Sequence, residues 1–335
     1  MAIPHSSPTI SSSILNQLQL LFESKILQSE DVYDETAQQF CKKFNLDNIY
    51  FTQSGTHALY WLLRGFNFKS HDEIILPTYV CPSIYQAVLS VGAKPVLCDT
   101  GDYWHMSRQS VSQKITKRTK AIIVVNLFGM ALNCTEFDFP NILILNDLCQ
   151  SFDHLTYPNF NHGDAVFFSF GPTKYITAGL GGAFSLIKKN IQFNNLLLDK
   201  FLGSPLSTLN LTLLQQQIKD YDFFVTRRKE IADSYSNQLS KSLTQNISLQ
   251  YNAFYRYPLI QNFEQFESIQ KKFNKQFISV RRGVDQLIHR SLGMSDDLFP
   301  NAVKSFNNTL SIPLYPSLND KEVERIIITT KKIME

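Results

Sequence analysis

The stretch from residue 121 to residue 170 contains three short apolar runs: Ala121-Ile-Ile-Val-Val125, Asn141-Ile-Leu-Ile-Leu145 and Ala165-Val-Phe-Phe-Ser-Phe170. Each run is continuous rather than alternating, which is typical of strands that are covered on both faces. Helix-like stretches separate several such runs, so we predict an α/β fold with a mainly parallel sheet flanked by helices. Runs of the same kind occur at Ile49-Tyr-Phe-Thr52, Glu73-Ile-Ile-Leu-Pro77, Pro95-Val-Leu-Cys98 and Ala183-Phe-Ser-Leu-Ile187.

The pattern changes after about residue 205, where long polar helical stretches replace the strand–helix alternation. We therefore predict two domains, a large α/β domain over residues 1–225 and a smaller C-terminal α+β domain over residues 226–335. The elements expected in the second part are helices over 211–239, 268–287 and 320–332, and strands within 247–259 and 310–313.

Composition narrows the class of protein. The 335 residues are 44% hydrophobic and 18% charged, which is typical of a soluble globular protein, and the net charge of only +3 does not indicate binding to nucleic acid or to an anionic membrane surface. No apolar run is long enough to cross a bilayer, and residues 1–7 lack the basic and apolar regions of a signal peptide. We expect a cytoplasmic protein without a metal site, because its five cysteines are odd in number and lack metal-type spacing (Cys41, Cys81, Cys98, Cys134 and Cys149).

Lys174 is the residue most suggestive of chemistry. It ends the segment Ser169-Phe-Gly-Pro-Thr-Lys174, which follows a predicted buried strand and precedes the glycine-rich turn 179–182. Open α/β sheets bind ligands in loops of this kind, beyond the ends of their strands. Most loop lysines are nevertheless solvated surface charges, so the interpretation depends on the neighbouring motifs.

Two other strand ends carry matching groups. Asp147 ends the run that begins at Asn141, and Ser54-Gly-Thr56 lies between a predicted strand and a predicted helix. Taken alone, Asp147 reads as a turn former and Ser54 as a helix cap. Taken together, they offer a carboxylate and a helix N-terminus that favours a phosphate, and Ser169 adds a further hydroxyl.

One cofactor requires this combination of groups. An amine can hold an aldehyde cofactor as a Schiff base, a carboxylate keeps a pyridine nitrogen protonated, and a helix N-terminus binds a phosphate. The sequence therefore predicts pyridoxal 5'-phosphate, with Lys174 and Asp147 as the catalytic residues.

The order of these motifs resembles that of the DegT/DnrJ/StrS-type sugar aminotransferases, and the resemblance extends over nearly the whole chain. The most specific pieces are the Lys174 segment, Ser54-Gly-Thr56 and Asp147-Leu-Cys-Gln150. The supporting pieces are Asp72-Glu-Ile-Ile-Leu-Pro77, Gly92-Ala-Lys-Pro-Val96 with Asp99, Thr119-Lys-Ala-Ile-Ile123, Gly163-Asp164, Gly181-Gly182, Arg228-Lys-Glu-Ile-Ala-Asp-Ser-Tyr235 and Ser311-Ile-Pro-Leu-Tyr-Pro316.

The resemblance implies a fold-type-I pyridoxal-phosphate enzyme that acts as a homodimer on a keto sugar, usually nucleotide-linked, with glutamate or another amino acid as the donor. It implies that Lys174 holds the cofactor and moves the proton, that Asp147 pairs with the ring nitrogen, and that Gln150 lies near the ring hydroxyl. The phosphate would be held by Ser54, Gly55, Thr56 and Ser169. For the freed lysine to act as a base, we expect burial and a cationic ring to lower its pKa.

The chain also departs from the family pattern. Asn126 stands where a histidine is common, and Leu180 replaces an acidic residue in the glycine turn. The residue that stacks on the cofactor ring is left open between Tyr79 and Cys81. The segment 203–217 differs from the stretch that often reaches the partner's phosphate, with Thr208 and Asn210 as the nearest registers.

The leading functional hypothesis is an aminotransferase in amino-sugar and surface-polysaccharide biosynthesis. Two alternatives stay open: another pyridoxal-phosphate reaction on a sugar, such as dehydration or epimerisation, and a non-catalytic homologue with a structural or regulatory role. The retained Lys174 weighs against the dehydratase branch, whereas the departures at Asn126 and Leu180 motivate the non-catalytic alternative. The sequence leaves the sugar, the carbon that is aminated and its stereochemistry open.

Overall fold

The computed structural model describes residues 2–26, 29–101, 103–157, 159–189, 191–194, 206–244, 252–261 and 266–335. Its main sheet has seven strands in the order β1-β7-β6-β5-β4-β2-β3. The strands are β1 (Tyr50–Thr52), β2 (Glu73–Pro77), β3 (Lys94–Cys98), β4 (Thr119–Val125), β5 (Leu143–Asp147), β6 (Ala165–Ser169) and β7 (Gly182–Leu186).

The sheet is mainly parallel. The hydrogen-bonded pairs that join β3, β2, β4, β5 and β6 are all parallel, whereas β7 is antiparallel to both β6 and β1. The predicted α/β class with a mainly parallel sheet is therefore confirmed, and each apolar run quoted above forms a strand to within two residues of its predicted ends.

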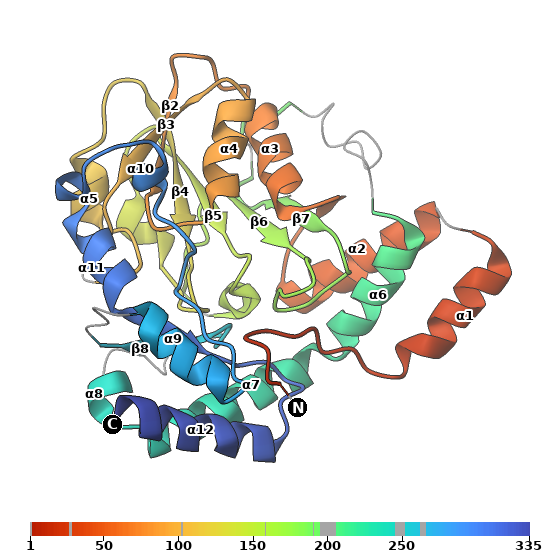
Figure 1. The fold of residues 1–335 in the computed structure, drawn as a ribbon. Coiled ribbons are helices and arrows are strands. Elements are labelled where there is room, and N and C mark those ends of the chain that lie inside the picture. The colour runs from red at the N-terminus through yellow and green to blue at the C-terminus, as the bar shows by residue number, and fades with distance from the viewer. Residues whose placement is uncertain are drawn as a thin grey trace.

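Both faces of the main sheet are buried, which explains why its strands are continuously apolar. In β2 and β4, residues such as Leu76 and Ile123 pack on one face, and Ile75 and Ile122 pack on the other. Helices α3 (Gly55–Phe66) and α4 (Pro82–Ser90) lie together over one face in Figure 1 and add Leu62 to that core. On the other face, α2 (Glu30–Phe44) and α6 (Thr208–Lys219) contribute Phe40, Phe44 and Leu214.

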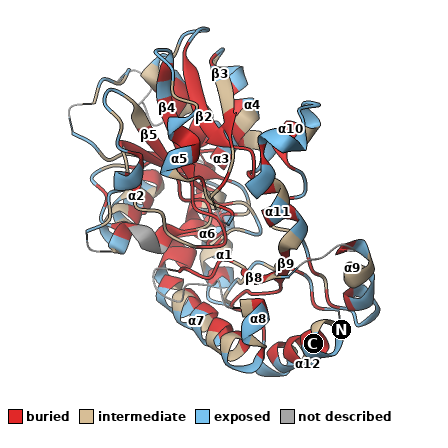
Figure 2. Ribbon diagram, turned by 90° about the vertical axis from the view of Figure 1, so that its left-hand side faces the viewer, coloured by how far each residue is buried: buried red, intermediate tan, exposed pale blue. Residues whose placement is uncertain are grey.

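A second, two-stranded antiparallel sheet belongs to the C-terminal part of the chain. It pairs β8 (Tyr257–Ile260) with β9 (Thr309–Ile312) and shares a separate apolar core with the surrounding helices. The outer surfaces of the helices that surround this core are exposed in Figure 2. These helices are α7 (Tyr221–Gln238), α8 (Lys241–Thr244), α9 (Phe266–Lys275) and α12 (Asp320–Met334). Residue 225 falls inside α7, and the division into domains 1–225 and 226–335 stays a prediction.

Two helix predictions were wrong in extent. The stretch 211–239 is divided at Asp220, whose side chain accepts hydrogen bonds from Ser11 and Gln216 where α6 ends and α7 begins. The stretch 268–287 is helical only as far as Lys275, because Phe277 adopts a left-handed backbone conformation with a φ of 57°. The following backbone then pairs in extended form, Ile278 with Ile3 and Arg281 with Ser311. Residues 247–251 of the predicted strand region lie outside the described part of the chain.

The remaining elements are short or peripheral. Helix α1 (Ile14–Ser24) projects from the body of the molecule beside α6 (Figure 1). The others are α5 (Arg108–Ser112), α10 (Ile288–Ser291), α11 (Pro300–Asn308) and the 3-10 turns Cys134–Phe137, Phe152–Thr156 and Asp296–Leu298. Within the described ranges, every helix is too short or too polar to cross a membrane.

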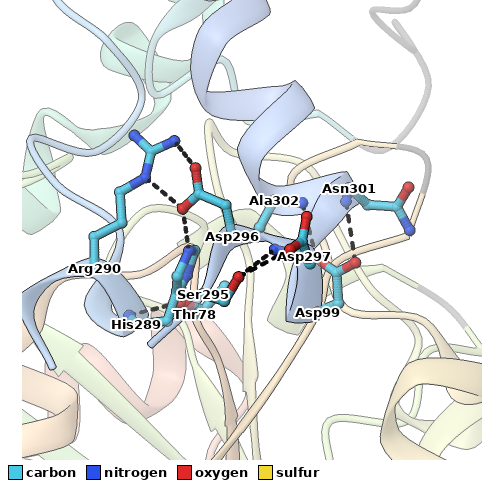
Figure 3. Close-up of polar contacts among 9 residues, drawn as sticks. All are labelled: Thr78, Asp99, His289, Arg290, Ser295, Asp296, Asp297, Asn301 and Ala302. Atoms are coloured by element: carbon cyan, nitrogen blue, oxygen red, sulfur yellow. Dashed lines mark hydrogen bonds and ion pairs between the residues drawn. The ribbon is translucent and has the colours of Figure 1, made fainter. Parts of the chain in front are cut away.

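Helix α11 is joined to the main sheet by Asp99, which follows β3. Its carboxylate accepts the backbone N–H groups of Asn301 at 3.0 Å and Ala302 at 2.8 Å, as Figure 3 shows. A carboxylate at a helix N-terminus satisfies otherwise unpaired donors and opposes the positive end of the helix dipole. The role of Asp99 is therefore structural.

We predict that Asp99→Ala lowers the free energy of unfolding by about 1 kcal/mol, the usual cost of losing an N-terminal helix cap. Chemical denaturation of the purified variant measures this difference. Asp47→Ala is the control, because both side chains of the ion pair between Asp47 and Lys189 are exposed, and a change below about 0.5 kcal/mol is expected there. Equal effects of the two substitutions would contradict the assignment.

Candidate active site

A cavity of about 450 Å³ lies at the carboxyl ends of the parallel strands, where α/β sheets commonly bind ligands. The groups predicted from the sequence come from the ends of three strands, β1, β5 and β6, and meet in this cavity. Its lining includes every predicted site residue: Ser54, Gly55, Thr56, Asp147, Gln150, Ser169 and Lys174.

The predicted phosphate turn is held by a close contact between backbones. Ser54 caps α3 by accepting the His57 N–H at 3.1 Å, which leaves the first turn of the helix open to the cavity. A Cβ at Gly55 would lie 2.8 Å from the Cβ of Ser169, and a Cβ at Gly182 would lie 2.4 Å from the Gly55 nitrogen. Glycine is therefore required at both positions, and it brings the helix N-terminus next to the strand end that carries Ser169.

Asp147 is the last residue of β5, and its side chain is only 7% exposed. One carboxylate oxygen accepts the backbone N–H of Cys149 at 2.9 Å. Burial raises the pKa of Asp147, although the hydrogen bonds with Cys149 and the charge of Lys174 act in the opposite direction. A buried carboxylate of this kind is stabilised by a cationic partner.

Lys174 follows a tight turn in which its backbone N–H donates to the carbonyl of Gly171. Its Nζ lies 6.0 Å from the centroid of the Tyr255 ring, and the Tyr255 hydroxyl donates to the carbonyl of Thr173 at 3.0 Å. Tyr255 thus holds the loop that carries the lysine.

The pKa of Lys174 is raised in the protein's own environment, contrary to the expectation from the sequence. Burial lowers the pKa, but the negative charges that Tyr255, Cys149 and Asp147 can carry outweigh it. The expected depression of the pKa assumed a cationic ring beside the amine, and the protein groups alone do not supply that charge.

Gln150 and Asn126 form part of the polar floor beside Asp147. The Gln150 carbonyl oxygen accepts the backbone N–H of Phe128 at 2.8 Å, so its amide nitrogen remains available as a donor. Asn126 is buried and donates to the side chain of Asn146 and to the carbonyl of Asp147, while its own oxygen accepts the Leu132 N–H. Asn126, which replaces the histidine common in the family, therefore forms hydrogen bonds through both ends of its amide group and stabilises the end of β5.

The structure separates the two candidates for the stacking residue. Tyr79 is completely buried in the apolar core and does not line the cavity, whereas Cys81 is exposed and does. Residues Val80 and Cys81 precede α4 and form the wall of the cavity on the β2 side.

This wall is tied to the opposite lining segment by buried polar contacts, drawn in Figure 3. The Thr78 hydroxyl lies 2.8 Å from Nδ1 of His289, and Nε2 of the same ring lies 3.0 Å from Asp296. Asp296 in turn accepts two hydrogen bonds from Arg290. The chain of contacts joins the loop after β2 to residues 289–296, which follow the cavity-lining segment 281–286 in the chain.

The sequence-based interpretation missed the lining residues from the C-terminal part of the chain: Tyr255, Arg256, Arg281, Gly283, Val284, Asp285 and Gln286. Most were assigned to a helix over 268–287 that ends earlier. The one available signal was Gly283, where a Cβ would lie 2.2 Å from the Tyr79 hydroxyl.

Asn210 makes a hydrogen bond within its own chain, whereas the buried hydroxyl of Thr208 has no hydrogen-bond partner among the described residues. Asn210 donates to the carbonyl of Ala178 at 2.6 Å, and Thr208 is 1% exposed. Leu180, in the loop that Asn210 holds, is 66% exposed. Residues 203–205 of the segment 203–217 are outside the described ranges.

The chain can now be compared with known proteins. The model of the DegT/DnrJ/EryC1/StrS aminotransferase family matches residues 8–331. A GDP-perosamine synthase of Escherichia coli O157:H7 is 24% identical over 353 residues, which cover 96% of this chain and 95% of that protein.

Solved structures share the fold. A putative sugar aminotransferase of Streptococcus pneumoniae, in its PMP form, superposes with a TM-score of 0.90 at 20% identity and covers 99% of this chain and 98% of its own. A GDP-4-keto-6-deoxy-D-mannose-3-dehydratase of Escherichia coli, with bound hydrated PLP, gives a TM-score of 0.84 at 18% identity and covers 98% and 99%. With the family match over nearly its whole length, the chain belongs to the DegT/DnrJ/EryC1/StrS aminotransferase family of pyridoxal-phosphate enzymes.

Proposed function

We propose that this enzyme transfers an amino group from an amino acid, with glutamate as the first choice, to a keto sugar carried on a nucleotide. The observation that carries the proposal is the meeting of Lys174, Asp147 and the N-terminus of α3 in one cavity. The Escherichia coli relative has a GDP-linked amino sugar in its name, which supports a nucleotide-linked substrate. We place the reaction in cytoplasmic amino-sugar biosynthesis for a surface polysaccharide.

The residues present fit pyridoxal phosphate. The glycine at position 55 leaves the first turn of α3 accessible from the cavity, and the Thr56 and Ser169 hydroxyls line the same space. The cofactor's phosphate would be held by these groups together with Ser54, because a helix N-terminus offers unpaired N–H donors. The buried carboxylate of Asp147 would hold a proton on the ring nitrogen, and the cationic ring would help to offset the cost of burying this carboxylate.

When bound, the cofactor supplies the aldehyde that carries the amino group and a ring that accepts the electron pair left when a proton is removed. Lys174 would hold the cofactor through Nζ and, once released, would move the proton. The amide nitrogen of Gln150 would donate to the ring hydroxyl, since its amide oxygen already accepts the Phe128 N–H. Val80 and Cys81 cover the space on the β2 side, and Tyr255 keeps the lysine loop in position.

Two alternative functions remain testable. One is a sugar dehydration or epimerisation with the same cofactor, since a dehydratase shares the fold. The other is a non-catalytic homologue. The complete set of amine, carboxylate and phosphate-binding turn in one cavity favours catalysis over the second alternative, and the retained Lys174 favours transamination over the first.

We predict that the purified enzyme, loaded with pyridoxal phosphate, converts glutamate to 2-oxoglutarate in an amount equal to its cofactor content. Lys174→Arg should abolish this half-reaction, because the guanidinium remains protonated and cannot accept the proton. Lys188→Arg is the control, since the exposed Lys188 lies outside the cavity lining and pairs with Asp164, and arginine keeps its charge. If adding glutamate changed neither the absorbance of the bound cofactor nor the amount of 2-oxoglutarate, the result would instead indicate the dehydratase or non-catalytic alternatives.

We predict that Asp147→Asn abolishes the half-reaction yet stabilises the cofactor-free protein at neutral pH. Because the folded-state pKa of Asp147 is raised, the folded state binds this proton more tightly than the unfolded state. Stability is then lost as the pH rises above the usual aspartate pKa, and asparagine removes that loss while keeping the acceptor for Cys149. Melting temperatures from pH 4 to pH 8 should show a difference that grows with pH.

The matched control is Asp164→Asn, because Asp164 is buried but is paired with Lys188 and accepts the Ile144 N–H. Removing this charge should lower the melting temperature. If Asp147→Asn also lowered the melting temperature across the whole pH range, the claim that the buried Asp147 carboxylate destabilises the cofactor-free protein would be disproved.

We predict that Cys81 is the cysteine most rapidly alkylated by N-ethylmaleimide and that reductive attachment of the cofactor slows this reaction. Cys81 is exposed in the cavity, whereas Cys98, Cys134 and Cys149 are buried. Mass spectrometry of time points measures each site, and Cys41, which is partly exposed elsewhere, serves as the internal control. Equal rates at Cys81 with and without cofactor would place the cofactor away from this wall.

We also propose that the enzyme is a homodimer in which α1 contacts the second copy. The projecting helix exposes Leu15, Leu20 and Phe22 at 64%, 66% and 58%. Leu209, at the start of α6, and Leu180, in the loop after Lys174, are also exposed. A second copy of the chain would bury these side chains close to the lysine loop, as expected for an active site at a subunit interface.

We predict that Leu20→Asp shifts the protein from a dimer to a monomer of 38.5 kDa, because a charge in an apolar interface costs more than the contact gains. Light scattering after size-exclusion chromatography measures the mass. Ile328→Asp, at a 59% exposed position on α12, should leave the mass unchanged. A dimer that persists in Leu20→Asp would exclude α1 from the interface.

A further inference from the structure

The cavity contains two arginines that the proposed chemistry does not use. We propose that Arg256 and Arg281 form a binding site for an anionic group of the substrate, a carboxylate or a phosphate, beside Lys174. The inference rests on the proposed function and extends it from the cofactor to the molecules that the cofactor reacts with.

The backbone places both arginines at the same end of the small sheet. Arg256 immediately precedes β8, whose first residue pairs with Ile312 of β9. Arg281 pairs with Ser311 through two backbone hydrogen bonds of 3.2 and 2.7 Å. The two arginines therefore flank the end of β9 on either side, and both line the cavity that contains Lys174.

Neither arginine has an anionic partner among the described residues. The Nε of Arg256 is buried without a hydrogen bond, and its guanidinium lies 5.1 Å from the centre of the Tyr255 ring. Arg256 is half-buried and Arg281 is exposed, whereas four other arginines each donate to a carboxylate or a carbonyl oxygen: Arg227, Arg228, Arg282 and Arg290. A buried guanidinium nitrogen without a hydrogen-bond partner costs free energy of folding. We expect such an unpaired donor where a ligand supplies the missing acceptor.

The pKa of the neighbouring His5 reflects the positive charge of the two arginines. His5 is 4% exposed and lies 2.8 Å from the Ser311 hydroxyl. Burial and then the charges of Arg256 and Arg281 hold its pKa well below the usual value. The lowered pKa of His5 is thus consistent with two positively charged guanidinium groups close to the same end of β9.

The chemistry of transamination explains an anion at this place. An amino-acid donor carries a carboxylate next to the reacting carbon, and a nucleotide-linked sugar carries a diphosphate next to the sugar. Guanidinium groups bind both kinds of oxyanion through paired N–H donors. The cofactor's own phosphate has a separate site at the N-terminus of α3, formed by other residues of the cavity.

The test uses the holoenzyme and the variants Arg256→Met, Arg281→Gln and Arg256→Lys. Calorimetry measures the binding of two probes, glutarate for the carboxylate arm and uridine diphosphate for the phosphate arm. Loss of one charge-assisted contact should weaken the relevant probe by about 10- to 100-fold. Arg256→Lys should lose less, because the charge is kept and only the paired geometry is lost. The probe that is weakened identifies the source of the anion.

Arg282→Gln is the matched control, since its guanidinium is directed to Glu267 and the Phe306 carbonyl rather than to the cavity. It should bind both probes as the wild type does, and melting temperatures check that each variant is folded. The proposal is overturned if folded Arg256→Met and Arg281→Gln bind both probes as tightly as the wild type. It is also overturned if they lose cofactor content instead, because the arginines would then hold the cofactor.

The binding measurement is independent of the proposed activity. If the wild-type enzyme binds a probe through these arginines but does not convert glutamate, the anion site stands and the proposed function fails. If glutamate is converted normally by both arginine variants and neither probe is weakened, the function stands and the anion site fails.

Discussion

The antiparallel strand β7 determines the geometry on which the candidate site depends. It returns from the lysine loop and inserts between β6 and β1, so that Gly182 pairs with both Ser169 and Thr52. There is no room for a side chain at Gly182, because a Cβ would lie 2.4 Å from the Gly55 nitrogen. This contact holds the N-terminus of α3, the end of β6 and the base of the lysine loop within one cavity. The parallel direction of β5 then brings Asp147 to the same edge.

The charges in the cavity are arranged for a bound ligand. Burial raises the pKa of Asp147, whereas nearby groups that can carry negative charge raise the pKa of Lys174 despite its burial. Burial alone would also raise the pKa of Tyr255, yet the charges of Arg256, Lys174 and Arg228 lower it. A cationic ring beside Asp147 would help to offset the burial of its carboxylate, and an anion beside Arg256 would pair with a guanidinium that has no carboxylate partner among the described residues. This imbalance costs stability and is typical of functional sites.

Much of the large sheet and of its site was predictable from local sequence. The strands are continuous apolar runs because both faces are covered, and the glycines at 55 and 182 mark the close backbone contact. The C-terminal lining was not predictable in the same way. Apolar residues after Ser268 have helical spacing, but Phe277 takes a left-handed conformation and the chain pairs with Ile3 and Ser311, which are distant in sequence. Long-range pairing of this kind overrides local propensity.

The central claim is that Lys174 holds pyridoxal phosphate. Borohydride reduction of the cofactor-loaded enzyme, followed by digestion and mass spectrometry, tests it directly by locating the covalent phosphopyridoxyl group. The account predicts that this group is found on the peptide that contains Lys174, in a one-to-one ratio with the chain. Its attachment to another lysine, such as Lys188, or the absence of a covalent product from enzyme that has bound the cofactor, would contradict the account.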